Sequence, residues 1–126
     1  MNRSKIGAWL LLALLVLGVA SSWGMGRFSG PIQAQVAQAG EAALAGDWEN
    51  AETLARQARV RWERYRNFCA ALADHEPMEH IDGLFAQLEV YRQIRDGVNF
   101  ATVCAQLSQD TKAIGEAHSL TWWNLL

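Results

Sequence analysis

The sequence has few residues that interrupt helices and no pattern that builds strands. It holds two prolines among 126 residues, and its β-branched residues never alternate with polar ones over the length of a strand. Ala, Leu, Gln, Glu and Arg dominate residues 33–114, and these side chains lose little rotamer freedom in a helix. The composition argues against a sheet and favours an all-α fold.

Basic charge is also scarce. The formal net charge is −2, and setting Arg3 and Lys5 aside leaves nine basic residues against thirteen acidic ones, a balance of −4. A general nucleic-acid binder shows a net basic domain. We therefore expect no nucleic-acid partner.

The sequence lacks a complete catalytic or metal-binding arrangement. A zinc-protease helix needs His-Glu-x-x-His, but His80 follows His75 by five residues and Pro77 interrupts the segment. Two ligands sharing one helix face do not complete a zinc site. We interpret Glu76, Glu79 and Asp82 as charges that complement the dipole at a helix start. A protein that is not an enzyme, with no metal and no cofactor, is expected.

Cysteine is limited to Cys69 and Cys104. A compartment outside the cytoplasm would permit a disulfide. In an up-down-up arrangement the two residues lie toward opposite ends of their helices, roughly 10–15 Å apart, whereas a bridge requires Cα atoms within about 7 Å. We interpret both as buried free thiols, and a disulfide between chains stays open.

One long stretch lacks charge altogether. Residues 6–26 contain no charged side chain, and about 20 apolar residues span a hydrocarbon core roughly 30 Å thick. Arg3 and Lys5 precede the stretch, which places the N-terminus in the cytoplasm by the positive-inside rule. This predicts a cytoplasmic stub over residues 1–5, a transmembrane helix over 6–26 and an extracytoplasmic domain over 27–126 of a cell-membrane protein. The alternative is a signal peptide cleaved after Ala20, and both interpretations export the domain.

The rest of the chain predicts an antiparallel helical bundle of three long helices plus a membrane-proximal helix. Gly30-Pro31 is expected to separate the membrane-proximal helix from the transmembrane segment, since proline suits the first turn of a helix. Further boundaries are expected at Gly46-Asp47, at residues 74–77 and at Asp96-Gly97.

A seam of apolar residues is the clearest pattern of the bundle. Its members recur alternately three and four residues apart: Trp48, Ala51, Ala55, Ala58, Trp62, Tyr65, Cys69 and Leu72. Such a seam requires a long partner helix at a shallow crossing angle. That helix belongs either to the same chain or to a second copy, so a homo-oligomer through residues 48–72 is one expectation. The alternative function, a ligand-binding or sensing domain, would use Trp48, Trp62 and Tyr65 or the segment of residues 75–82.

Two surfaces remain for a partner. The tail is apolar and is expected to dock on the bundle, lie in the membrane interface or meet a partner: Trp122, Trp123, Leu125 and Leu126. Arg59, Arg61 and Arg66 flank the seam, and a folded-back hairpin would bring Arg64 and Arg66 beside Glu79 and Asp82. Anionic lipid headgroups or an acidic partner are the alternative for these arginines. We expect an interaction or accessory module for another envelope or membrane protein.

Several short motifs carry a resemblance over nearly the whole chain. They are Asp47-Trp48-x-x-Ala51, Trp62, Asp74-His75-Glu76, Ile81-Asp82 with Leu84, and Asn124-Leu125-Leu126. In this order, after an N-terminal apolar segment, they resemble a family of small bacterial membrane proteins, the domain-of-unknown-function family 4363. Pro77 departs from the pattern. The resemblance implies a class, a topology and an uncleaved anchor, and it implies no activity or catalytic residue.

Overall fold

A computed structural model of the chain contains four helices and no strand in the part that the structure describes. They are α1 (Arg3–Leu44), α2 (Trp48–Cys69), α3 (His75–Gln93) and α4 (Gly97–Leu125). The backbone is described for residues 3–69 and 75–125, and the side chains for residues 3–17, 30–67 and 77–116. The predicted all-α class is confirmed. Among the described residues, no helix offers an apolar run long enough to cross a membrane.

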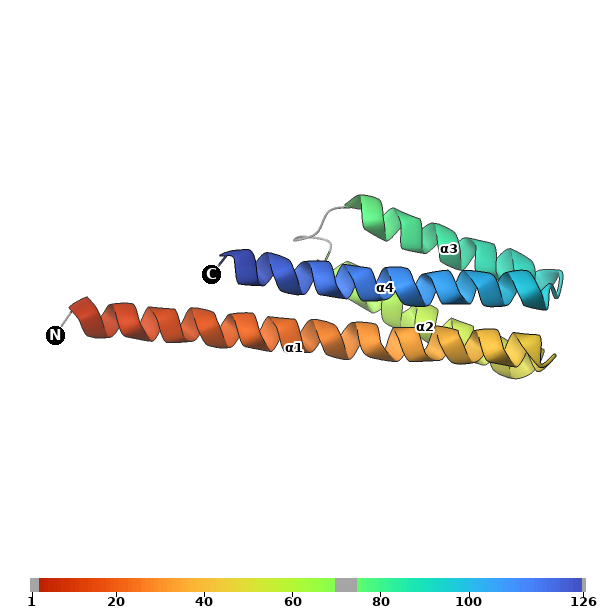
Figure 1. The fold of residues 1–126 in the computed structure, drawn as a ribbon, viewed down its shortest axis with the longest axis horizontal. Coiled ribbons are helices and arrows are strands. Elements are labelled where there is room, and N and C mark those ends of the chain that lie inside the picture. Colours follow the sequence, from red (N-terminus) through yellow and green to blue (C-terminus); the bar gives the residue numbers. More distant parts are fainter. Residues whose placement is uncertain (1–2, 70–74, 126) are drawn as a thin grey trace.

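The helices form an up-and-down bundle (Figure 1). α1 runs antiparallel to both α2 and α4, and it packs most extensively on α4. α3 packs on α4, whereas α2 and α3 barely touch. Both ends of the chain lie at the same end of the bundle, and the N-terminal part of α1 continues beyond the end of α4.

The expected break at Gly30-Pro31 is wrong, because α1 continues unbroken through Pro31 for 42 residues. An interior proline removes one backbone hydrogen bond and costs about 3 kcal/mol. Ile32 and Val36, directly after it, are fully buried, and helix stability in proteins comes mainly from packing of an apolar face. The predicted transmembrane segment and the membrane-proximal helix therefore belong to one helix, roughly 60 Å long.

The core draws on all four helices. α1 contributes small and β-branched residues, α2 contributes Trp62 and Tyr65, and α3 and α4 contribute larger aliphatic and aromatic side chains. The buried set is Ile32, Val36, Ala39, Ala42, Ala43, Ala51, Ala58, Trp62, Tyr65, Met78, Ile81, Leu84, Phe85, Leu88, Phe100, Val103, Cys104 and Leu107. The small residues of α1 allow close helix approach: a Cβ on Gly40 would lie 3.2 Å from the Cβ of Cys104.

The seam predicted on α2 is confirmed as core from Trp48 to Tyr65. Ala51 and Ala58 are fully inaccessible, and Trp48 and Ala55 are partly buried against the core. Its main packing partner is α1 of the same chain. Cys69 and Leu72 lie outside the described side chains. The homo-oligomer through residues 48–72 stays a prediction, since the structure holds one chain.

The first turn, between α1 and α2, follows the expected Gly-stop and Asp-cap pattern. Gly46 takes a φ of 79°, and Asp47 N–H donates to the Ala42 carbonyl at 2.9 Å while Gly46 N–H donates to the Ala43 carbonyl at 3.1 Å. This is a Schellman ending. The Asp47 carboxylate then accepts from the Asn50 N–H at 3.2 Å and caps α2.

The turn between α3 and α4 repeats this geometry with a different residue in the left-handed position. Asp96 again caps the next helix, accepting from the Asn99 N–H at 3.1 Å, but Arg95 takes the positive φ of 54°. The boundary expected at Asp96-Gly97 is confirmed, since α3 ends at Gln93 and Gly97 is the first residue of α4. A Cβ there would lie 2.9 Å from the Ala43 carbonyl oxygen, so glycine at this position permits the close approach of α4 to the end of α1.

Candidate functional site

The arginines that the sequence singled out have different surroundings. Arg66 Nε lies 3.1 Å from an Asp82 carboxylate oxygen on α3, which confirms part of the expected charge pairing between the two helices. Arg59 pairs within α2, with its Nε 3.6 Å from Glu63. Arg61 and Arg64 are exposed, and neither makes an ion pair with a described residue. The helices therefore bring Arg66 to α3 and leave Arg61 on the surface.

A cleft separates α2 from α3 over the half of the bundle nearest the two turns. Its volume is about 390 Å³, within the usual range for ligand pockets. The floor is apolar and comes from three helices: Ala55 of α2, Phe85 and Leu88 of α3, and Phe100 of α4. Phe85, Leu88 and Phe100 are each at most 3% exposed. The cleft exists because α2 presents a small alanine where a larger side chain would reach α3.

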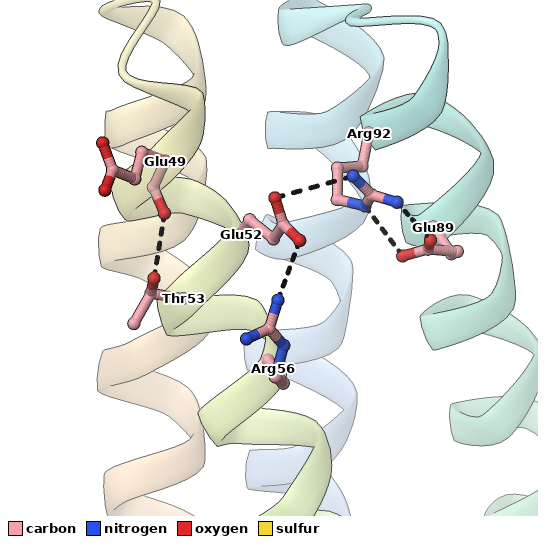
Figure 2. A network of polar contacts seen from close by, with 6 residues as sticks. All are labelled: Glu49, Glu52, Thr53, Arg56, Glu89 and Arg92. Carbon is pink, nitrogen blue, oxygen red and sulfur yellow. Dashed lines mark hydrogen bonds and ion pairs between the residues drawn. The ribbon is translucent and has the colours of Figure 1, made fainter.

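Charged side chains form the rim of this cleft (Figure 2). Arg92 binds Glu89 through two donors, Nε at 3.0 Å and a terminal nitrogen at 2.6 Å. One carboxylate oxygen of Glu52 on α2 accepts a hydrogen bond from a terminal nitrogen of Arg56 at 2.8 Å. The other oxygen lies 3.6 Å from a terminal nitrogen of Arg92 across the cleft. The contact between Glu52 and Arg92 is thus the polar link between α2 and α3 at this level.

The electrostatics of the rim follow from these pairs. The hydrogen bond from Arg92 holds the pKa of the Glu89 carboxyl below its ordinary value, while partial burial opposes that shift and the nearby Arg59 adds to it. The same hydrogen bond raises the pKa of Arg92. Both groups stay charged near neutral pH, and Arg59 adds a further cation to the rim.

Polar contacts around Asp82 form a second link between α2 and α3. The Trp62 indole N–H donates to one Asp82 carboxylate oxygen at 2.8 Å, and Arg66 approaches the other. Trp62 is 1% exposed, so this bond satisfies a buried donor that would otherwise lose its hydration. Asp82 therefore joins α2 to α3 and acts as a structural link.

The aromatic residues of the α2 seam belong to the core or pack against it: Trp62 and Tyr65 are buried and Trp48 is partly buried. Trp48 packs edge-on against Phe100 with ring centroids 5.4 Å apart, and Trp62 lies 5.7 Å from Tyr65. Sequence reasoning missed Phe85, Phe100 and Arg92 as cleft residues. The i, i+4 pair Glu52–Arg56 and the i, i+3 pair Glu89–Arg92 are readable along each helix. Nothing in the spacing shows that the two pairs face each other.

Two further expectations concern thiols and metal ligands. Cys104 is a buried free thiol, as predicted, and burial raises its pKa to about 12, so it is unreactive near neutral pH. Cys69, His75 and Glu76 lie outside the described side chains. Among the described residues, no three His, Cys, Asp or Glu side chains gather in a way that could hold a metal ion.

Among the described side chains, the exposed large apolar residues concentrate in the N-terminal part of α1. Between residues 6 and 17 the exposed large side chains cover every side of the helix: Ile6, Trp9, Leu10, Leu11, Leu12, Leu14, Leu15, Val16 and Leu17. Trp9 is 72% exposed. This part of α1 continues past the end of the bundle in Figure 1. The tail residues Trp122, Trp123, Leu125 and Leu126 lie outside the described side chains.

Comparison with known families decides what kind of chain this is. Residues 25–125 match the family described as a domain of unknown function, DUF4363. The chain belongs to this family. No curated protein and no solved structure matches it.

The DUF4363 match covers the bundle, including all residues of the cleft, and begins after the exposed apolar residues 6–17. The resemblance stated from the motifs is therefore confirmed as membership. Its described residues have structural roles: Asp47 caps α2, while Ala51, Trp62, Ile81 and Leu84 are buried. Asp74 and residues 124–126 lie outside the described side chains.

Proposed function

We propose that this DUF4363 protein is a membrane-anchored helical interaction module, not an enzyme, whose N-terminus is cytoplasmic and whose bundle is extracytoplasmic. The observation that carries the proposal is the exposed apolar part of α1 over residues 6–17. A helix that is apolar on all sides is ordinarily buried in a large core or in a membrane, and soluble monomers rarely expose apolar patches of this extent. Arg3 and Lys5 before it support the orientation.

A pair of charge variants tests the anchor. Leu10→Arg with Leu14→Arg places two arginines in the apolar stretch, and Leu44→Arg with Val98→Arg makes the same chemical change at the turns. Leu10 and Leu44 are equally exposed, at 61%, so the control matches the test. Each arginine at the centre of a membrane helix costs about 3 kcal/mol. The first variant should be released from membranes by alkaline carbonate, and the second should stay. Equal retention of both would overturn the anchor.

The mass of the protein recovered from membranes tests the topology. An intact N-terminus supports an uncleaved anchor. Protection of the bundle from protease in sealed inside-out vesicles, with digestion in right-side-out vesicles, supports its extracytoplasmic side. Loss of residues 1–20 would replace the anchor by a cleaved signal peptide and a released bundle.

The partner that we propose is another envelope or membrane protein, bound in part through residues 120–126. The apolar character of Trp122, Trp123, Leu125 and Leu126 supports this, since such residues are enriched in the cores of interfaces. Cross-linking in intact cells followed by affinity purification of the anchored chain should recover one protein in stoichiometric amount. Deletion of residues 120–126 should reduce that recovery strongly. Recovery of no specific protein by either form would contradict the proposal.

The cleft between α2 and α3 favours a second candidate function, binding of a small apolar anion. Its floor is apolar, and its rim has three arginines beside two glutamates, so a carboxylate ligand would bind by replacing the weakest of the existing partners, Glu63, which lies 3.6 Å from Arg59. A panel of aryl and alkyl carboxylates should include compounds that raise the melting temperature saturably. Ala55→Leu, which fills the cleft, should abolish the shift. No shift with any compound of the panel would contradict this function.

A further inference from the structure

The arginines of α2 fall into two groups. Arg56, Arg59 and Arg66 each lie within 3.6 Å of a carboxylate of the same chain. Arg61 and Arg64 are exposed and have no ion pair with a described residue. A guanidinium keeps its charge at any physiological pH. These two arginines therefore carry positive charge that no carboxylate of the described residues neutralises.

Helix geometry places both arginines on one flank of α2. The side chain of Gln57 lies on the α1 side, because it accepts a hydrogen bond from Gln35 at 3.2 Å. Arg61 and Arg64 follow Gln57 by four and seven residues, so they share its flank. Since α2 runs antiparallel to α1, Arg61 lies about one turn, and Arg64 about two turns, closer than Gln57 to the end from which the apolar part of α1 leaves the bundle (Figure 1).

The alignment of Gln57 with Gln35 also gives the distance from the two arginines to the proposed membrane. An apolar run that ends near Gly26 puts the hydrocarbon boundary about five residues, or roughly 8 Å of helix, before Pro31. Arg61 lies near the level of Pro31, and Arg64 lies closer still to the boundary. Both charges are then within about one Debye length of a membrane surface. Among the described acids, Glu63 pairs with Arg59 and Asp82 pairs with Arg66.

We infer that Arg61 and Arg64 form a contact surface for anionic phospholipid headgroups at the membrane face of the bundle. The inference rests on the proposed membrane anchor and adds to it a lipid class and two binding residues. The phosphates accept hydrogen bonds from the guanidinium groups, whose planar donors match phosphate geometry. The contact holds the bundle against the bilayer and orients the cleft and the two turns away from it.

Lipid selectivity in reconstituted vesicles tests the surface. The full-length chain is placed in phosphatidylcholine vesicles that contain a trace of spin-labelled phosphatidylglycerol or phosphatidylcholine, and electron spin resonance gives the relative association of the two lipids with the protein. An arginine near an anionic surface contributes up to about 1 kcal/mol, which is about fivefold in association at a factor of ten per ~1.4 kcal/mol. Arg61→Gln with Arg64→Gln should lower the selectivity for phosphatidylglycerol about two- to fivefold, and high salt should remove the difference.

A matched control keeps total charge constant between variants. Arg95→Gln with Ile94→Glu lowers the total charge by two, as the test pair does, at exposed positions beside the turn and outside the cleft, and should leave the selectivity unchanged. Arg3 and Lys5 contribute equally in all three proteins. Helix content and melting temperature verify that each variant folds.

The outcomes separate this inference from the anchor on which it rests. Insertion with equal selectivity in wild type and in Arg61→Gln with Arg64→Gln overturns the headgroup surface alone. An equal loss in the control pair also overturns it, because the effect would then depend on net charge. Complete release of wild type by carbonate, with no motionally restricted lipid in the spectrum, overturns the anchor.

Discussion

The two long sides of α2 are held in different ways. α2 packs extensively on α1, and its small core residues Ala51 and Ala58 are fully inaccessible. Toward α3, it is joined by Trp62 and Arg66 to Asp82 and by Glu52 to Arg92, across a cleft of about 390 Å³. Apolar packing requires matching shapes, whereas long charged side chains bridge a gap. The second side is therefore the one on which the bundle can change shape or admit a ligand.

The sharpest test of the contrast compares Ala58→Leu with Ala55→Leu, since these two alanines lie one turn apart on α2. Ala58→Leu inserts volume at a fully inaccessible core position. It should destabilise the bundle by about 1–3 kcal/mol, since a packed core has no room for the added atoms. Chemical denaturation followed by helix circular dichroism measures the change. An unchanged denaturation midpoint would show that the core around Ala58 also contains free space.

Trp62→Phe removes the hydrogen bond by which the buried indole of α2 is joined to Asp82 of α3, while keeping most of the ring volume. The loss of the bond to Asp82 should cost about 1–1.5 kcal/mol. The double variant with Asp82→Ala measures the coupling between the two groups. Additive effects of the two single changes would contradict a direct contribution of this bond to stability.

Ala55→Leu should act in the opposite direction from Ala58→Leu. The leucine extends into the cleft over Phe85 and Leu88, and its partly buried methyl groups should stabilise the bundle by about 0.5–1 kcal/mol. The same denaturation experiment measures it. Equal destabilisation by Ala55→Leu and Ala58→Leu would remove the distinction between the two sides of α2.

The smallest expected effect is the pH dependence of folding stability that comes from Glu89 at the rim of the cleft. Because the pKa of Glu89 is lowered in the folded chain, its contribution is fully present above the ordinary glutamate value near 4.5 and is lost as pH falls through the lower folded value. Glu89→Gln should reduce stability at pH 7 by about 0–1 kcal/mol, since the pair is only partly buried, and the difference from wild type should vanish in acid. A difference that persists at low pH would assign the effect to packing.

Features that depend on neighbouring residues can be predicted from the sequence alone. Asp47 and Asp96 follow a helix end and cap the next helix, as their positions predict, because capping involves only adjacent residues. The seam on α2 is predictable up to Tyr65, since a period of three and four residues reports one helix face. The charge pair of Arg66 with Asp82 follows from the expected hairpin.

Other positions mislead because the reason for their residue type is distant in sequence. Pro31 has the features of a helix start, yet burial of Ile32 and Val36 outweighs the lost hydrogen bond and α1 continues. Gly97 lies at the expected boundary, but its lack of a Cβ serves contact with the Ala43 carbonyl, more than fifty residues away. Such steric constraints come from residues distant in sequence, so the adjacent residues do not reveal them.

The sequence by itself determined the helical class, the caps, the core face of α2 and the apolar stretch before the bundle, because each depends on spacing along a single helix. Only the tertiary structure decided that Glu52 meets Arg92, that Phe85 and Phe100 floor a cleft, and that Arg61 and Arg64 have no ion pair with a described residue. Those features depend on the relative positions of helices, which are set by the packing of small and large side chains across several interfaces at once.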